Sequence, residues 1–238
     1  MATKKRHTAD RRLPRGLEIL YEDDDILVVN KPAGLLTVAT ATNKTRTVYH
    51  VLTEYVRRGN PRSRNRVFIV HRLDQWTSGV LLFAKSQPVK ERLQDRWQDV
   101  EKKYVAVVHG QLAEKEGVIS SYLAENRSFV VYSTTQAAGG KLARTAYRVL
   151  KEGPRFSLLE ITLLTGRKNQ IRVHLADKGH PIAGDRKYGK ADDGCPRLAL
   201  HAKSISFEHP VTGAQMAFDT KTPAYFHSLM NDIARRVR

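Results

Sequence analysis

Short apolar runs bounded by turn-forming residues recur along most of this chain, and they limit its fold more than any other feature. Such runs between Gly, Pro, Asn or Asp are typical of strands, whereas an amphipathic helix repeats its apolar residues every three or four positions. We expect strands at residues 17–21, 26–30, 67–70, 80–83, 104–108, 118–123, 128–133, 145–150, 158–164, 197–207 and 216–219.

Helical spacing interrupts this series at irregular intervals. Val48, Leu52 and Tyr55 follow the i, i+4, i+7 pattern of a helix. A second stripe ends at Trp97 and predicts a helix that packs this indole in the core. Helices are expected around residues 48–55, 87–100, 170–177 and 225–237. Because strands run in succession with helices inserted irregularly, the pattern predicts an α+β fold with a mixed sheet.

The chain is strongly basic. It has 41 Lys and Arg residues against 24 Asp and Glu residues among 238, which gives a formal net charge of +17. A merely soluble cationic surface is one explanation. A polyanionic partner is the better one, because Lys and Arg that neutralise phosphates release counterions, whereas an unused excess of one sign strains the folded state.

Composition and patterning also exclude several classes of protein. Cys195 is the single cysteine, so an internal disulfide and a cysteine-rich zinc site are excluded. The apolar runs are shorter than the roughly 20 residues of a membrane helix. No apolar segment follows the basic N-terminus as it would in a secretory signal. We therefore expect a cytoplasmic protein without membrane contact.

The organisation of the chain is simple. Residues 1–16 are basic and nearly free of apolar residues, which predicts a flexible tail. Residues 17–238 show no second apolar cluster behind a linker, which predicts one domain.

One polar block stands out between two apolar runs. Residues 71–79 read His-Arg-Leu-Asp-Gln-Trp-Thr-Ser-Gly and separate the expected strands at 67–70 and 80–83. A polar loop at a strand end is where functional residues commonly lie. The block carries Asp74, a carboxylate next to basic residues that favour its ionised form.

A second block begins where the strand expected at 158–164 ends. A glycine turn and a helix start provide free backbone N–H groups for phosphate. Arg167 and Lys168 lie in that turn, so phosphate contact is the role we expect for them. Arg172 is flanked by apolar residues and, if buried, needs an anion. Its partner is either any structural acid or, in the sharper hypothesis, Asp74.

The histidines and Tyr104 are less informative by themselves. His71, His174, His180 and His201 have no metal-ligand spacing, so structural hydrogen bonding explains them better than a metal site. Tyr104, after Lys103 at a strand start, is typical of core packing. Beside a nucleotide pocket it could instead stack on a base or accept a proton.

Together these blocks resemble the RluA-type family of pseudouridine synthases. The similarity extends over about residues 17–219. The blocks that carry it are 30–34 (NKPAG), 71–74 (HRLD) with 77–79 (TSG), 103–104 (KY), 166–167 (GR) with 170–174 (QIRVH), 180–185 (HPIAGD) with 188–189 (YG), and 198–202 (LALHA). Gln75-Trp76 and Asn169 depart from the family, which commonly has a basic and an acidic residue, and a histidine, at these places. An ordered set of blocks is far more specific than any one of them.

The resemblance implies a fold and an activity. The fold would be a mixed, largely antiparallel sheet flanked by helices, with a basic central cleft. The activity would be isomerisation of uridine in structured RNA to pseudouridine, without cofactor or metal. Family members with a small RNA-binding domain carry it ahead of the catalytic one, and here we expect none.

The resemblance also assigns roles. Asp74 would be the catalytic carboxylate, Arg172 the guanidinium paired with it, and Tyr104 the aromatic that stacks on the target base. Pocket-lining residues would be Arg72, Leu198 and Leu200, and contacts to the RNA backbone would come from Lys31 and Arg167. Further RNA or substrate contacts are expected from Gln75, Trp76, Lys103, Lys168, Gln170 and Ile171. We hypothesise that Trp76 occupies the stack vacated by a flipped-out base; packing against its own loop is the alternative.

Two other functions remain open. A non-catalytic RNA-binding or ribosome-assembly protein would keep the cleft without the chemistry. A nucleic-acid glycosylase would share base extrusion and one acid. The RNA itself, an rRNA or tRNA stem-loop, cannot be chosen from the residues, and a monomer is the simplest expectation.

Overall fold

The computed structural model describes residues 13–189 and 193–231. These residues form two compact units. The first contains the described residues up to Val100 together with 204–220, and the second contains 101–203 and the described residues from Lys221 onward. The single catalytic domain over 17–238 stays a prediction, and the basic tail predicted at 1–16 falls mostly outside the described residues.

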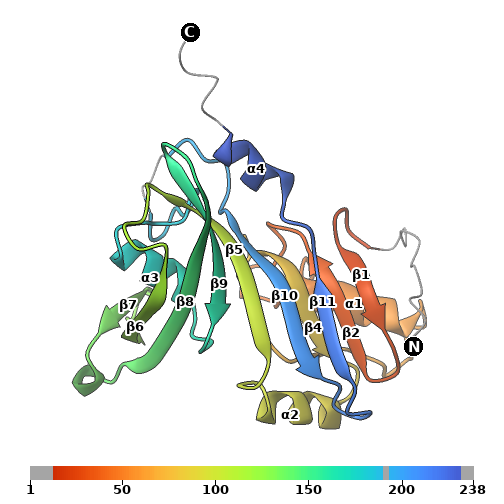
Figure 1. Cartoon of the computed structure of the whole chain (residues 1–238). Helices are drawn as coiled ribbons and strands as arrows, with labels where there is room; N and C mark the ends of the chain where they lie inside the picture. The colour runs from red at the N-terminus through yellow and green to blue at the C-terminus, as the bar shows by residue number, and fades with distance from the viewer. Residues whose placement is uncertain (1–12, 190–192, 232–238) are drawn as a thin grey trace. The chain divides into compact units, whose positions relative to one another are not determined.

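The first unit is built on antiparallel strands. In this unit β2 pairs antiparallel with both β1 and β4, and β10 pairs antiparallel with β11 (Figure 1). The elements are β1 (Glu18–Glu22), β2 (Ile26–Lys31), α1 (Val48–Arg57), β3 (Phe68–Ile69), β4 (Ser78–Ala84), α2 (Gln87–Asp95), the part of β10 (Leu200–Glu208) from Ser204, and β11 (Gln215–Asp219).

The core of the first unit follows from side-chain alternation along these strands. Ile26 and Val28 on β2, and Val80 and Leu82 on β4, belong to one buried cluster, because alternate residues of a strand face the same side. Trp97 is half-buried and packs against this cluster, as predicted from the stripe.

The second unit contains strands in the order β5-β9-β8-β6-β7, and each neighbouring pair is antiparallel. Helix α3 packs on β6, β7 and β8, and α4 packs on β5 and β9. The elements are β5 (Glu101–His109), β6 (Glu116–Glu125), β7 (Val131–Thr134), the 3-10 turn η1 (Gln136–Ala138), β8 (Lys141–Glu152), β9 (Phe156–Leu163), α3 (Gln170–Asp177), the start of β10, and α4 (Ala224–Met230).

The predicted α+β class with a mixed, largely antiparallel sheet flanked by helices is confirmed. The basic cleft stays a prediction. In the described part of the chain, no helix combines the length and apolar character needed to cross a membrane.

Some boundaries differ from expectation for local reasons. The strand expected at 67–70 is only Phe68–Ile69. The strand expected at 128–133 starts at Val131, because Asn126 holds the preceding residues in a turn. The helix expected at 87–100 ends at Asp95. The last helix is described as far as Met230, and 232–237 lie outside the described residues.

Candidate active site

The loop from β3 to β4 carries Asp74, and its neighbours on both sides are held by the 31–37 segment. The backbone of Leu73 makes two bonds with the Thr37 hydroxyl: the hydroxyl donates to Leu73 O (2.7 Å) and accepts from Leu73 N (3.2 Å). On the other side, the amide of Gly34 donates to Gln75 O (2.8 Å). Half-buried Asp74 is therefore fixed at its backbone on either side.

Lys31 supports the same loop from inside the first unit. Its side chain is 0% exposed, and Nζ donates to the carbonyl oxygens of Pro32 (3.1 Å), Leu35 (2.7 Å) and Gln75 (2.9 Å). An ammonium has three protons, so these bonds use all of its donors. Burial lowers the pKa of Lys31 to about 7, and the charge of Asp74 opposes the shift. The predicted contact of Lys31 with an RNA backbone must be corrected, because this side chain has no surface to offer.

The rim around Asp74 is exposed. Arg72, Gln75 and Trp76 all lie at the surface, and half of the Trp76 surface is in solvent. Trp76 also lies against Gly34, where an added Cβ would be 3.3 Å from Cζ3 of the indole. Trp76 therefore has an exposed surface that could fill a vacated base stack and a packed surface against its own loop, so both roles stay open.

In the second unit, the turn between β9 and α3 is organised by a buried glutamine. Gln170 Oε1 accepts from the Thr165 hydroxyl (2.7 Å) and the Arg167 amide (3.0 Å), and Nε2 donates to Arg144 O and Thr145 Oγ1 (both 2.9 Å). Gln170 is only 2% exposed, so its predicted RNA contact must also be corrected. Its role in this structure is to hold the turn that presents exposed Arg167.

Arg172 has a structural acid as a partner. Its Nε and Nη2 donate to the two carboxylate oxygens of Asp185, both at 2.7 Å, in a two-pronged pair. Nη1 donates to Asn169 Oδ1 (3.2 Å), and the guanidinium lies 5.0 Å from the Tyr188 ring centroid. Asn169 precedes α3 with φ 53°, a left-handed conformation that Asn tolerates well.

Asp185, the partner of Arg172, lies in the 180–185 block, and the sequence alone suggested no role for it. Its side chain is completely buried, and Oδ1 also accepts from the amides of Lys187 and Tyr188. Gly184 precedes it with φ +74°, and a Cβ there would collide with the backbone carbonyl of Arg197. One sequence signal could have identified Asp185. Arg172 lies between apolar residues and, if buried, needs an anion, and Asp185 is an acid that directly follows the apolar residues and glycine of the 180–185 block.

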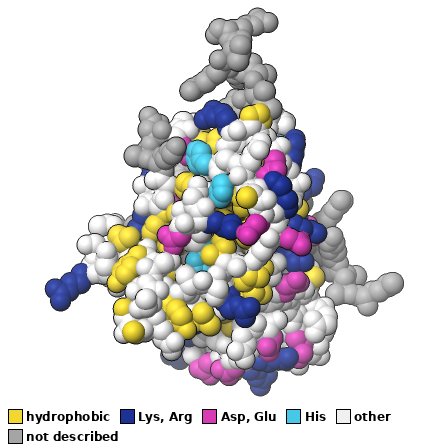
Figure 2. All heavy atoms as spheres, turned by 60° about the vertical axis from the view of Figure 1, so that its left-hand side comes forward, with side chains coloured by type: hydrophobic (Ala, Val, Ile, Leu, Met, Phe, Trp, Pro, Cys, Tyr) yellow, Lys and Arg dark blue, Asp and Glu magenta, His cyan; other side chains and the backbone are white. Residues whose placement is uncertain are grey.

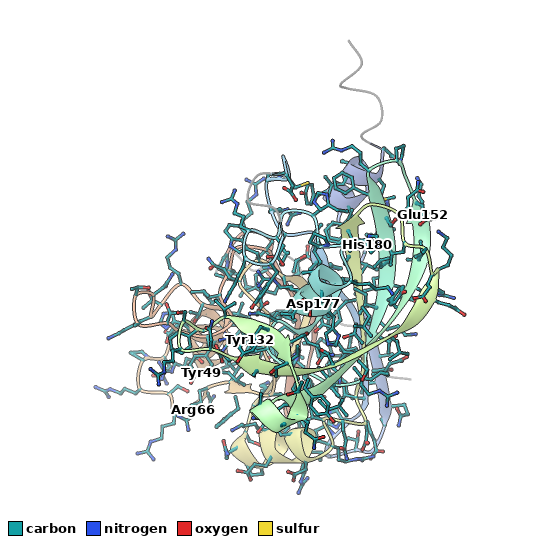
Figure 3. The ribbon with its side chains drawn as sticks, turned by 90° about the vertical axis from the view of Figure 1, so that its left-hand side faces the viewer. Tyr49, Arg66, Tyr132, Glu152, Asp177 and His180 are labelled. Carbon is teal, nitrogen blue, oxygen red and sulfur yellow. The ribbon has the colours of Figure 1, made fainter. Side chains whose placement is uncertain are left out.

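Helix α3 also carries a hydrogen-bond relay. Ser133 donates to the Asp177 carboxylate, so the Ser121 hydroxyl donates to Ser133, and Ser121 in turn accepts from Nε2–H of His174. Burial favours the neutral imidazole, in which Nδ1 accepts from the Thr145 hydroxyl. The members in order are Gln170, Thr145, His174, Ser121, Ser133 and Asp177, the last labelled in Figure 3. Burial lowers the pKa of His174 against the opposing charge of Asp177.

The remaining predicted residues of the second unit are mostly buried. Tyr104 is 8% exposed on β5, opposite Ile161 of β9. Lys103 is half-buried and pairs with Glu101 (3.2 Å). Lys168 is exposed and pairs with Glu125. Buried apolar positions are occupied by Ile171, Leu198 and Leu200.

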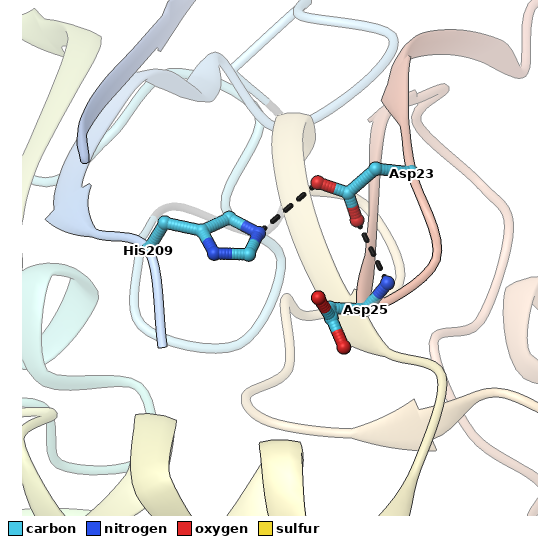
Figure 4. A group of neighbouring side chains, drawn as sticks. All are labelled: Asp23, Asp25 and His209. Atoms are coloured by element: carbon cyan, nitrogen blue, oxygen red, sulfur yellow. Dashed lines mark hydrogen bonds and ion pairs between the residues drawn. The ribbon is translucent and has the colours of Figure 1, made fainter. Parts of the chain in front are cut away.

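Asp23, Asp25 and His209 gather in the first unit as a group with metal-ligand chemistry (Figure 4). Nδ1 of His209 accepts from the amides of Val211 and Thr212, so Nε2 carries the proton and donates to Asp23 Oδ2 (3.0 Å). Burial raises the pKa of Asp23, but hydrogen bonds from the backbone amides of residues 25 and 26 and from the Tyr21 hydroxyl, with the charge of His209, together lower the net pKa. These bonds occupy both carboxylate oxygens of Asp23 and both ring nitrogens of His209, so these two residues join two turns.

Comparison with known sequences supports the family resemblance of the sequence blocks. A family model described as RNA pseudouridylate synthase matches residues 25–177, which include Asp74, Tyr104 and Arg172. The chain belongs to the RNA pseudouridine synthase family. It is therefore an enzyme of the isomerase class.

Individual relatives of the synthase extend the match. An uncharacterized RNA pseudouridine synthase of Bacillus subtilis, YhcT, is 36% identical over 220 residues, 90% of this chain and 71% of that protein. Ribosomal large subunit pseudouridine synthase D of Neisseria meningitidis is 35% identical, over 92% of this chain and 61% of that protein. tRNA pseudouridine synthase C of Haemophilus ducreyi is 34% identical, over 90% and 95%. In structure, human RNA pseudouridylate synthase domain containing 4 matches with a TM-score of 0.73 at 25% identity, covering 89% of this chain and 91% of that one.

The structure brings the predicted residues of the synthase together in two groups. One loop of the first unit, which Lys31 contacts through Gln75 O, carries Arg72, Asp74, Gln75 and Trp76. The second unit holds Tyr104, Arg167 and Arg172 with the rest. Asp74 belongs to the first unit and Arg172 to the second, so their pairing stays a proposal.

Proposed function

We propose that this synthase isomerises specific uridines in structured RNA, an rRNA or tRNA stem-loop, with Asp74 as the catalytic carboxylate acting on a flipped-out nucleotide. The observation that carries the proposal is the construction of the Asp74 loop. Both residues flanking Asp74 have their backbone bound by the 31–37 segment, while the side chains around the carboxylate reach solvent. A fixed carboxylate in an exposed rim suits attack on a substrate that enters from solvent.

The chemistry needs a carboxylate and a proton acceptor. In the isomerisation the bond from the sugar to N1 of uracil breaks and a bond to C5 forms; C5 loses a proton and N1 gains one. No atoms or electrons enter or leave, so no co-reactant is required. Asp74 would attack the sugar or the base or assist loss of a sugar proton, and Tyr104 would stack on the uracil and accept the proton from C5.

Arg172 would orient the carboxylate of Asp74. Asp185 takes two of the three guanidinium nitrogens, which fixes the plane of the group. We propose that this fixed plane presents positive charge to Asp74. Extruding the target base costs a few kcal/mol, which the exposed Gln75 and Trp76 would offset by filling the vacated stack.

The choice of RNA rests on the relatives. One relative is named for the ribosomal large subunit and another for tRNA, so we propose rRNA or tRNA as the substrate class. A monomeric, cytoplasmic enzyme remains our expectation.

One assay tests the proposal. Purified protein is incubated with bulk rRNA and tRNA from a strain lacking it, and carbodiimide-resistant uridine adducts are mapped. We expect new pseudouridine at discrete positions, abolished by Asp74→Asn and retained by Asp24→Asn, an exposed acid of the first unit. RNA binding without product would support the non-catalytic alternative, and free uracil would support a glycosylase.

A further inference from the structure

The turn between β6 and β7 places an aromatic ring in solvent at a conformational cost. Phe129 is 70% exposed and has φ +58°, in the left-handed region that bulky side chains rarely adopt. Burial does not compensate for this backbone, because most of the ring surface is in water. An exposed strained residue of this kind is a reason to look for a function.

The turn is well ordered by its own hydrogen bonds. Asn126 Oδ1 accepts from the amides of Ser128 (3.0 Å) and Val130 (2.9 Å). The Asn126 amide donates to Val130 O, and the Phe129 amide donates to Asn126 O, both at 2.9 Å. The ring is therefore displayed by a pre-formed turn, which lowers the entropic cost of binding.

Basic side chains lie next to the turn, and one of them, Lys168, also pairs with Glu125. Lys168 Nζ lies 5.5 Å from the ring centroid, and Lys187 Nζ donates to the Phe129 carbonyl oxygen (2.8 Å). Exposed Arg127 is two residues before Phe129. On the face shown in Figure 2, apolar side chains reach the surface among both basic and acidic side chains. An aromatic ring among cations matches a nucleotide, which combines a flat base with a phosphate.

The turn is also tied to the proposed catalytic arginine. The amide of Val131, two residues beyond Phe129, donates to the Tyr188 hydroxyl (3.1 Å), and the Tyr188 ring lies under the guanidinium of Arg172. The same hydroxyl accepts from Asn169 Nδ2 (3.0 Å), at the start of α3. Tyr188 thus fixes the turn and Arg172 within one unit.

We propose that the Phe129 turn is a stacking platform for an unpaired base of the substrate RNA, with Lys168 and Lys187 next to its phosphates. This inference rests on the proposed function and extends it, because it assigns a contact to a nucleotide other than the target uridine. It also predicts that the bound RNA is single-stranded at this point, since a paired base offers no free face.

The test measures binding without turnover. Every variant carries Asp74→Asn, and the probes are a short fluorescent oligoadenylate, which contains no uridine, and a blunt RNA duplex of the same length. Phe129→Asn removes the ring and suits the left-handed backbone, whereas Phe129→Tyr and Phe129→Trp keep an aromatic face. Val118→Thr, at an exposed apolar position of β6, is the matched surface control.

We expect Phe129→Asn to bind oligoadenylate about five- to a hundredfold more weakly, the range for loss of one stacked base. The Tyr, Trp and Val118→Thr variants should stay within about twofold, and duplex affinity should not change. The thermal midpoint of Phe129→Asn should be equal or higher, since backbone strain is relieved.

Two binding results and one stability result would overturn the proposal. One is unchanged oligoadenylate affinity in Phe129→Asn; the other is an equal loss for oligoadenylate and duplex, which would indicate charge or shape rather than stacking. A lower thermal midpoint would also count against it, because the ring would then serve packing. Because binding is scored without product, failure here is distinguishable from failure of the pseudouridine assay.

Discussion

Nζ of Lys31 lies 2.9 Å from the carbonyl oxygen of Gln75, the residue that follows Asp74 in the chain. With Pro32 and Leu35 it gives this ammonium three carbonyl acceptors in a fully buried position. A group that sequence similarity assigned to the RNA thus serves to hold the loop of the proposed carboxylate.

Replacing Lys31 by Met should loosen that loop. Three buried carbonyl oxygens would lose their donor, at about 1 kcal/mol each, and relief of the buried charge would offset part of the loss. We expect about 2 kcal/mol lower stability in urea at about pH 7 and about tenfold lower kcat, with little change in KM. Lys44→Met, at an exposed position, should leave both unchanged. Wild-type kcat in Lys31→Met would show that the loop needs no such support.

The lowered pKa of Lys31 predicts a pH dependence of stability. The unfolded lysine binds its proton up to about 10.5, while in the folded protein burial lowers the pKa to about 7, against the opposing charge of Asp74. Between these values the unfolded state holds more protons, so stability should rise with pH, by up to about 1.4 kcal/mol per unit. Other groups titrate too, so the measurement is the difference between wild type and Lys31→Met at about pH 7 and about pH 9. A difference that does not vary with pH would contradict the lowered pKa.

Asp185→Asn should allow the guanidinium of Arg172 to leave the plane in which the Asp185 carboxylate holds it. The substitution leaves an arginine with one neutral partner where it had a two-pronged carboxylate. Breaking a buried pair costs about 3 kcal/mol or more, and kcat should fall at least about tenfold. Glu160→Gln breaks an exposed pair with Arg148 and should cost less than about 1 kcal/mol. Urea unfolding and steady-state kinetics on the same preparations decide this; wild-type kcat in a folded Asp185→Asn would refute the positioning role.

His174 predicts a loss of stability in mild acid. Burial lowers its pKa in the folded state, which favours the neutral ring. As pH falls through the unfolded value near 6.5, the unfolded state takes up a proton that the folded state does not, so stability is full above this value and lost below it. Between about pH 8 and about pH 5, wild type should therefore lose more stability than His174→Asn. Equal losses in the two proteins would mean that His174 does not titrate in this way.

Gly184 and Gly179 provide a matched pair of substitutions. Both have positive φ, +74° and +83°, but a Cβ at Gly184 would collide with the backbone of Arg197, whereas nothing lies within 4 Å of one at Gly179. Gly184→Ala should cost about 3 kcal/mol or more, and Gly179→Ala about 1 kcal/mol from backbone strain alone. Similar thermal midpoints for the two variants would argue against the tight approach at Gly184.

The sequence by itself determined the elements and the family. The residue pattern located α3 over its full range and the strands β2 and β9 within one or two residues, because apolar runs and the residues that end a helix are visible in the order of residues. The ordered blocks identified the family that the comparisons then showed. The short β3 and the Asn126 turn escaped, since each depends on one or two local hydrogen bonds.

Only the tertiary structure decided what individual polar residues do. Three buried polar residues bind partners that are distant in the sequence: Lys31, Gln170 and Asp185. Nothing in the composition reveals that these side chains are buried. Burial changes their roles because a desolvated polar group must spend its donors and acceptors inside the protein. The same reason distinguishes them from Phe129, whose apolar ring stays in water and whose function must be sought outside the fold.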